Sequence, residues 1–323
     1  MTEHRSAVFT AVRRRTALFA IAALPALLLA GCAAPEPLPL PPRASLPHDQ
    51  GRIWQVEGEG IERSYVFGTF HISDPRVLAI PDAAEQAFVR SQTAAFEYDY
   101  GPEDARTEHI DRKRFELPEG TTLRSIVGNG TYGQLINVVR GHGDWIPRNN
   151  LKPWAMWDAL GGWRGTFYTS DDESDPNKLV LDDWLQQRAY VEGKTVVGLE
   201  TVEEGFVKYD TIPQDQQIAL LRTLVDNWYR RRAGAPVVQS YVDGDLAMLI
   251  AFWNESMSWY PPEVGEMLTF RILDNRNRIM VERMLPLMEE GPTFVAVGAA
   301  HLPGEEGILR LLEQRGFTVT RLH

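Results

Sequence analysis

Short hydrophobic stretches bounded by turn residues give both ends of the folded region, residues 51–323, an alternating strand and helix pattern. In the N-terminal part, strands are predicted at 52–57, 64–70 and 93–98, with a helix at 81–91. In the C-terminal part, strands are predicted at 293–297 and 317–322, around a helix at 304–315. Both ends therefore repeat the order strand, loop, helix and strand.

The middle of the chain, about 103–290, has the hydrophobic spacing that is typical of helices. The helices are predicted at 121–140, 154–167, 179–192, 213–232 and 267–289. One strand, 195–199, interrupts them. The pattern thus predicts an α/β fold, with a central mixed sheet built from the N- and C-terminal units and a large helical insertion that covers the cleft.

The first 31 residues differ, because several arginines precede an almost purely apolar run at 17–30. A basic start before an apolar run shorter than the ~20 residues that cross a bilayer is typical of a signal peptide. The run ends in Leu-Ala-Gly-Cys, which resembles the lipobox of bacterial lipoproteins. We therefore expect cleavage after residue 31, lipidation of Cys32, and a proline-rich linker over residues 32–50.

We expect the lipidated protein to be anchored in a membrane outside the cytoplasm. Several acyl chains anchor a protein stably, and position 33 is not acidic, so we expect the periplasmic side of the outer membrane.

The net charge is −11, and removing residues 1–31, which carry four Arg and one Glu, leaves −14. This charge argues against nucleic-acid binding, which needs clustered Lys and Arg. Lipidation of Cys32, the only cysteine, leaves no thiol for a disulfide or a nucleophile.

A Gly-x-x-His motif occurs at both ends of the chain, each time directly after a predicted strand. The two copies begin at Gly68 and Gly298 and end at His71 and His301. Ligands of open α/β sheets bind beyond the carboxyl ends of the strands. If the two strands are parallel neighbours, both imidazoles reach one crevice.

Two carboxylates accompany these histidines, because Glu97 and Glu200 also end predicted strands. Two His with one or two carboxylates suit a divalent ion such as Mn, Co or Zn, which activates water or polarises a carbonyl. Each residue also has an ordinary explanation, since a strand-end Glu commonly caps a helix and a lone His is commonly structural. The residues by themselves leave both interpretations open.

Eight segments from about residue 52 to the C-terminus are similar to the TraB/GumN family of metal-dependent hydrolases, which includes the Tiki proteases. They are YVFGTFHISDP, AFEYD, KPWAMW, LDDWL, GKTVVGLET, YVDGDL, NRNRIM and VAVGAAHLPGEEGILRLLEQRGFTV. The C-terminal stretch GAAHLPGEEGILRLL is the most specific of them.

The resemblance implies a metal site and catalytic roles. The two family histidines fall on His71 and His301, and the two acidic positions on Glu97 and Glu200. A divalent metal bound by these four residues is expected. Alternatively, His71 would act as a general base; Glu97 would activate water or complete the metal shell, and Glu200 would orient a histidine.

The family's Arg-Asn pair falls on Arg276 and Asn277. Arg276 is expected to stabilise an oxyanion, because a fixed cation is effective where negative charge develops. The family pattern begins with Glu before this pair, whereas this chain has Asn275. That difference removes the expected neighbouring partner of Arg276.

The wider clan also contains erythromycin esterases and ChaN-like haem-binding lipoproteins, so the resemblance does not fix the activity. The first hypothesis is a peptidase-like, metal-dependent hydrolase that acts on a peptide or small-molecule substrate. One alternative is a metal-free esterase that uses His71 and Glu97. Another is a non-catalytic haem- or metal-binding lipoprotein, in which Tyr241 or Tyr260 is available as an axial ligand.

Overall fold

The computed structural model describes residues 39–102, 112–140, 149–161, 167–168, 179–228 and 232–323. The predicted signal peptide and the predicted lipidation site, Cys32, lie outside these residues and stay predictions. In the described part of the chain, no helix has an apolar stretch long enough to cross a bilayer.

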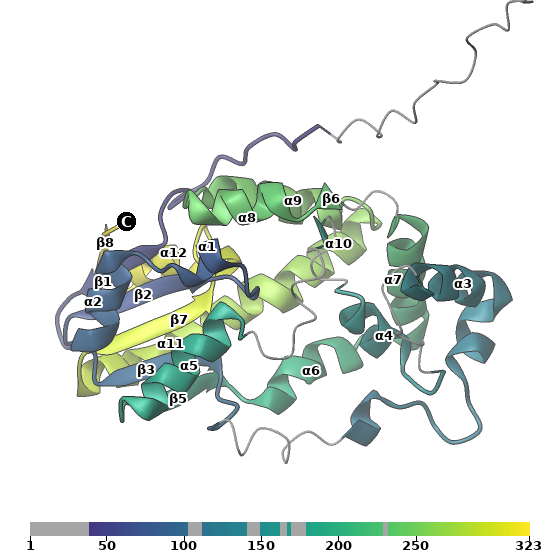
Figure 1. The fold of residues 1–323 in the computed structure, drawn as a ribbon, viewed down its shortest axis with the longest axis horizontal. Helices are drawn as coiled ribbons and strands as arrows, with labels where there is room; N and C mark the ends of the chain where they lie inside the picture. Colours follow the sequence, from purple (N-terminus) through teal and green to yellow (C-terminus); the bar gives the residue numbers. More distant parts are fainter. Residues whose placement is uncertain (1–38, 103–111, 141–148, 162–166, 169–178, 229–231) are drawn as a thin grey trace, which may run out of the picture. The chain divides into compact units, whose positions relative to one another are not determined.

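Six strands form one mixed sheet, as the pattern at both ends of the chain predicts (Figure 1). In sheet order they are β5 (Thr195–Glu200), β3 (Thr93–Tyr98), β7 (Thr293–Gly298), β2 (Ser64–Thr69), β1 (Ile53–Glu57) and β8 (Thr318–Arg321). The first four are parallel, and β1 is antiparallel to both of its neighbours. The C-terminal strand β7 therefore lies between two strands of the N-terminal part.

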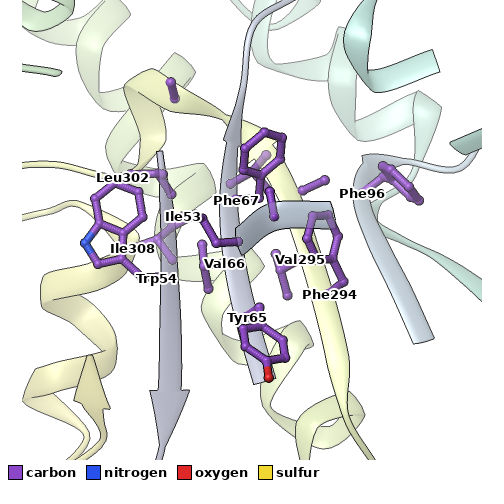
Figure 2. Packing of buried hydrophobic residues seen from close by; sticks show 14 of the residues in the cluster. Ile53, Trp54, Tyr65, Val66, Phe67, Phe96, Phe294, Val295, Leu302 and Ile308 are labelled. Carbon is purple, nitrogen blue, oxygen red and sulfur yellow. The ribbon is translucent and has the colours of Figure 1, made fainter. Parts of the chain in front are cut away.

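The two middle strands, β7 and β2, are almost completely buried, because the sheet lies inside the main hydrophobic core. Every residue of β2 is buried, and so are the first five residues of β7. Strands of this kind need cover on both faces. Figure 2 shows Phe67 of β2 near Phe294 of β7, and their ring centres are 5.8 Å apart.

Seven helices of the described chain bury apolar side chains in this core. They are α1 (Pro75–Leu78), α2 (Asp82–Arg90), α5 (Leu181–Val191), α8 (Ala235–Val242), α9 (Leu246–Met257), α11 (Asn275–Glu290) and α12 (Ile308–Gln314). Two of them, α5 and α11, also bring polar side chains to the site described below.

The helical insertion has a hydrophobic cluster of its own. Its helices include α3 (Leu123–Arg140), α4 (Pro153–Ala159), α6 (Val202–Asp210), α7 (Gln214–Asp226) and α10 (Pro262–Thr269). Trp154 and Trp157 of α4 are fully buried there. A π-helical turn, Phe270–Asp274, joins α10 to α11 and so connects this cluster to the sheet.

Several predicted helices end differently in the structure. The helix predicted at 154–167 ends at Ala159, because Gly161 adopts a φ of 65°, which an α-helix cannot continue. Phe167–Tyr168 (β4) instead pairs with Arg232–Ala233 (β6). The helix predicted at 213–232 correspondingly ends at Asp226.

The pattern of the sequence did not predict α6, α8 and α9 individually. Helix α9 is apolar on most of its surface, from Leu246 to Trp253, so it has little amphipathic periodicity. Helix α6 is marked by a capping box, in which Thr201 and Glu204 exchange hydrogen bonds with each other's backbone.

Candidate functional site

The two Gly-x-x-His motifs lie side by side, as the sequence predicts. Strands β2 and β7 are parallel neighbours, and Thr69 is in register with Gly298. His71 follows β2, and His301 ends a short 3-10 turn, Ala299–His301, directly after β7. Both side chains therefore reach the same carboxyl edge of the sheet.

Gly298 makes room for this convergence. A Cβ atom at this position would lie 3.0 Å from Glu97 Oε1, 3.5 Å from His301 Cδ2 and 3.9 Å from His71 Nε2. Three side chains thus surround the space that any other residue would fill. The first contact is tighter than ordinary van der Waals packing, so a larger residue would displace the carboxylate.

Glu97, at the end of β3, is the centre of the cluster. Its Oε1 accepts a hydrogen bond from the Gly298 backbone at 2.7 Å and lies 3.9 Å from His71 Nε2 and 3.7 Å from His301 Nε2. Burial by itself would raise the pKa of Glu97, but Arg276, the two histidines and the Gly298 hydrogen bond together hold the pKa well below its usual value. Glu97 is therefore an ionised carboxylate at neutral pH.

Arg276 of α11 joins the two strand-end carboxylates. Its Nη2 is 2.6 Å from Glu97 Oε2 and 2.5 Å from Glu200 Oε2, and its Nε is 2.7 Å from the same Glu200 oxygen. Asn275 does not supply a partner, so the partners come from β3 and β5 rather than from the adjacent residue. The guanidinium carries one positive charge between two buried negative charges.

His301 has a defined tautomer. The Asn277 amide donates through Nδ2 to the Glu306 carbonyl, so its Oδ1 faces His301 Nδ1 at 2.6 Å and accepts the proton there. His301 Nε2 accepts from Arg276 Nη1 at 3.2 Å, because arginine has no acceptor. Burial lowers the pKa of His301 to about 3, so the ring is neutral.

His71 is the accessible histidine, with 38% of its side chain exposed. Its Nδ1 lies 2.9 Å from Asp182 Oδ2, and the other Asp182 oxygen accepts from Thr69 Oγ1 at 2.5 Å. A carboxylate at Nδ1 favours a proton on that nitrogen and leaves Nε2 with a free electron pair. Asp182 was not predicted as a site residue, although it belongs to the segment LDDWL.

Glu200 lies behind Arg276 and does not line the cavity described next. The sequence-based hypothesis that it orients a histidine differs from the structure, where Asn277 and Asp182 flank the two histidines. Glu200 Oε2 is directed at Nη2 and Nε of Arg276. Its place supports an electrostatic role through that guanidinium.

A cavity of about 620 Å³ opens onto His71, Glu97, Arg276 and His301. Its volume is in the range of pockets that hold small organic ligands. Aromatic and aliphatic side chains from both hydrophobic clusters line its walls: Phe96, Phe206, Leu249, Phe252, Trp253 and Ile272. The cavity thus combines this polar cluster with largely apolar walls.

Three donor atoms in this cavity suit a divalent cation. Both histidine Nε2 atoms lie within 3.7–3.9 Å of Glu97 Oε1, against roughly 3.4 Å between ligands of a tetrahedral ion with bonds of about 2.1 Å. The set is wider than a formed centre, and no group of three His, Cys, Asp or Glu among the described residues is arranged closely enough to hold a metal ion. Ligation by His301 also requires Arg276 Nη1 to leave Nε2.

The tyrosines that the haem alternative would use do not line this cavity. Tyr241 is fully buried and donates to the Gly68 carbonyl at 2.8 Å. The Tyr260 hydroxyl accepts from Trp157 Nε1 at 3.0 Å. Both therefore have structural contacts in the two cores.

Comparison with known proteins gives a match over nearly the whole folded region. The sequence profile described as the TraB/PrgY/gumN family matches residues 52–321. This range includes every strand of the sheet and every residue of the histidine and carboxylate cluster.

Curated relatives are identical to this chain at about a quarter of the aligned positions. "Metalloprotease TIKI1" of Homo sapiens is 25% identical over 83% of this chain and 61% of its own length, and "Metalloprotease TIKI2" of Danio rerio is 26% identical over 79% and 58%. "Metalloprotease TIKI homolog" of Nematostella vectensis is 24% identical over 79% and 64%. The match thus spans about three-fifths of each relative. No solved structure matches the chain significantly.

Proposed function

The chain belongs to the TraB/PrgY/gumN family, and from this premise we propose that it is a metal-dependent hydrolase that cleaves peptide bonds. The observation that carries the proposal is the convergence of His71 and His301, from two parallel strands, on Glu97 Oε1. The names of the metalloprotease relatives support the same reaction class.

His71 Nε2, Glu97 Oε1 and His301 Nε2 are the atoms that would hold the metal. A divalent ion there would supply Lewis acidity and a more acidic water. Asp182 keeps the His71 ring oriented from behind, and Asn277 does the same for His301. Carboxylate and amide partners of this kind fix the ring orientation of histidine ligands.

Arg276 is placed to stabilise negative charge on the substrate. The Tyr98 hydroxyl accepts from Arg276 Nη2 at 3.0 Å, and both side chains line the cavity. A donor aimed at a developing oxyanion contributes about 3 kcal/mol to a reaction barrier. Glu97 stays ionised beside them, with its Oε1 3.9 Å from His71 Nε2 and 3.7 Å from His301 Nε2.

The test is metal binding by the full-length chain, purified in detergent without chelator. We expect calorimetry with Mn, Co or Zn to give one ion per chain, and the double variant His71→Ala, His301→Ala to lose it. His323→Ala, at the exposed C-terminus, is the matched control and should bind normally. Equal binding by the double variant would refute the metal site.

One observation favours a second candidate, a metal-free hydrolase. Arg276 Nη1 occupies the free electron pair of His301 Nε2 at 3.2 Å, while His71 and Asp182 form a pair suited to general-base catalysis. In that mechanism, His71 Nε2 takes the proton of the attacking water and returns it to the leaving group. Full peptide hydrolysis after exhaustive chelation would select this candidate over the first.

We also propose that lipid on Cys32 anchors the protein in the bacterial envelope, on the periplasmic side of the outer membrane. The Leu-Ala-Gly-Cys sequence after the apolar run supports this. Cells fed an alkyne fatty acid should label the wild type and not Cys32→Ser. Labelling of that variant would rule out the anchor.

A further inference from the structure

Lys208 is a cation in the wall of the cavity that the proposed reaction does not use. It lies on α6, and its Nζ donates to the Tyr98 hydroxyl at 3.3 Å and stands 5.1 Å from the Tyr209 ring centre. In the described part of the chain, Lys152, Lys194 and Arg276 each form an ion pair with a carboxylate, whereas Lys208 forms none. Its charge is therefore open to a ligand in the cavity.

Tyr98 adds a hydrogen-bond donor beside Lys208. Its oxygen accepts from Arg276 Nη2 and from Lys208 Nζ, and these two bonds use both electron pairs of a hydroxyl. The O–H proton must then be donated elsewhere. Gly205 of α6 allows the ring to sit here, since a Cβ atom at that position would lie 2.9 Å from it.

The charges around Lys208 leave it cationic at neutral pH. Burial and, to a smaller extent, the charge of Arg276 of α11 lower the pKa of Lys208 to about 8. Glu200 of β5, Glu97 of β3 and Asp158 of α4 act in the opposite direction, and Tyr98 and Tyr209 provide neutral contacts. A half-buried ammonium without a carboxylate partner is costly, so a bound anion would be favoured.

We propose that Lys208 and Tyr98 bind a carboxylate of the substrate, so that the enzyme selects peptides with a carboxylate close to the bond that is cleaved. The carboxylate would lie close to the cleaved bond because the Tyr98 hydroxyl contacts both Lys208 and Arg276. The apolar walls, including Phe206 and Trp253, fit a hydrophobic side chain next to that carboxylate. This inference rests on the proposed hydrolase function.

The test measures binding rather than turnover. Full-length protein in detergent, freed of metal by dialysis against chelator, is titrated with N-acetylphenylalanine and with its amide at pH 7. We expect the acid to bind roughly tenfold to a hundredfold more tightly, the gain that one charge-assisted hydrogen bond gives. N-acetylglutamate α-amide against N-acetylglutamine α-amide shows whether a side-chain carboxylate serves instead.

Lysine variants assign the preference to this site. Lys208→Met should lose it, Lys208→Arg should keep part of it, and Lys194→Met, outside the cavity, should keep all of it. Wild-type preference should also fall as the pH rises through about 8, because Lys208 then loses its proton. Tyr98→Phe should reduce the preference without changing this pH dependence.

The inference is overturned if neither acid binds better than its amide, or if Lys208→Met, shown to be folded by its melting curve, keeps the preference. These outcomes are separate from the hydrolase proposal. Acid preference without peptide cleavage would remove only the proposed reaction, and cleavage without acid preference would remove only this subsite.

Discussion

At the scale of single residues, the site works through neighbours that set charge and orientation. Asn277 fixes the proton of His301, Asp182 lies against His71, and Arg276 keeps Glu97 ionised. Each of these three residues contacts a member of the proposed catalytic cluster. Their effects should therefore appear in rates and pKa values more than in substrate affinity.

Asp182→Asn tests one such effect. The amide is nearly isosteric but carries no charge, so it no longer favours the proton on His71 Nδ1, and we expect kcat to fall by at least ~100-fold with little change in KM. The measurement is steady-state peptide hydrolysis. Asp183→Asn, the adjacent position on α5, is the matched control, and an equal loss there would contradict a specific role for Asp182.

Arg276→Met tests the charge balance. The change leaves Glu97 and Glu200 buried without their cation, and breaking a buried pair in this way costs about 3–5 kcal/mol. Denaturant unfolding should show this loss. Arg278→Met removes an exposed pair with Glu306 and should cost less than about 1 kcal/mol. Similar stabilities for the two variants would contradict the buried network.

These residues also show which parts of the site can be predicted from the sequence. His71, His301, Glu97 and Glu200 could be predicted, because each follows or ends a strand and strand ends share one edge of a sheet. Asp182 could not, since it reaches the site from a helix whose position depends on packing. The partners of Arg276 were hidden for the same reason, as they lie on strands distant in the sequence.

At the scale of elements, Gly298 at the end of β7 should be as important for the site as His301, which follows the strand. Gly298→Ala should place a methyl group 3.0 Å from Glu97 Oε1 and push the carboxylate away from both imidazoles. We expect at least tenfold lower activity and weaker metal binding. Gly133→Ala, on an open face of α3, adds a methyl group where no atom lies within 4 Å and should leave both unchanged. Normal activity of Gly298→Ala would show that the gap is not needed.

The helix that carries Arg276 illustrates the limit of periodicity. A single helix was predicted at 267–289, and the structure indeed runs without a break from α10 to Glu290. The π-helical turn at Phe270–Asp274 adds a residue to one turn and so rotates α11 relative to α10. Hydrophobic spacing alone does not show such a turn, and therefore did not show which side chains of α11 face the strands.

At the scale of the whole molecule, the buried site should make stability depend on pH. The pKa of His301 is about 3 in the folded protein and about 6.5 when exposed. The unfolded chain therefore binds the extra proton between these values, and stability present above pH 6.5 is lost as the pH falls. The lowered pKa of Glu97 adds a further loss below about pH 4.5.

Urea unfolding from pH 8 to pH 4 is the measurement. Since one pKa unit is worth about 1.4 kcal/mol, the free energy of unfolding should fall by a few kcal/mol over this range. His301→Gln should remove the part of the decline that lies between pH 6.5 and pH 4.5. A decline of the same size in that variant would assign the effect to other groups.

The position of β7 also has a consequence for how the protein is made. Strand β7 separates β3 and β5 from β2, β1 and β8, yet the ribosome adds it some two hundred residues after β3. Until it emerges, the nascent chain can form two half-sheets and no shared histidine pair. The histidine and carboxylate cluster therefore cannot form until the last strands of the chain have been made.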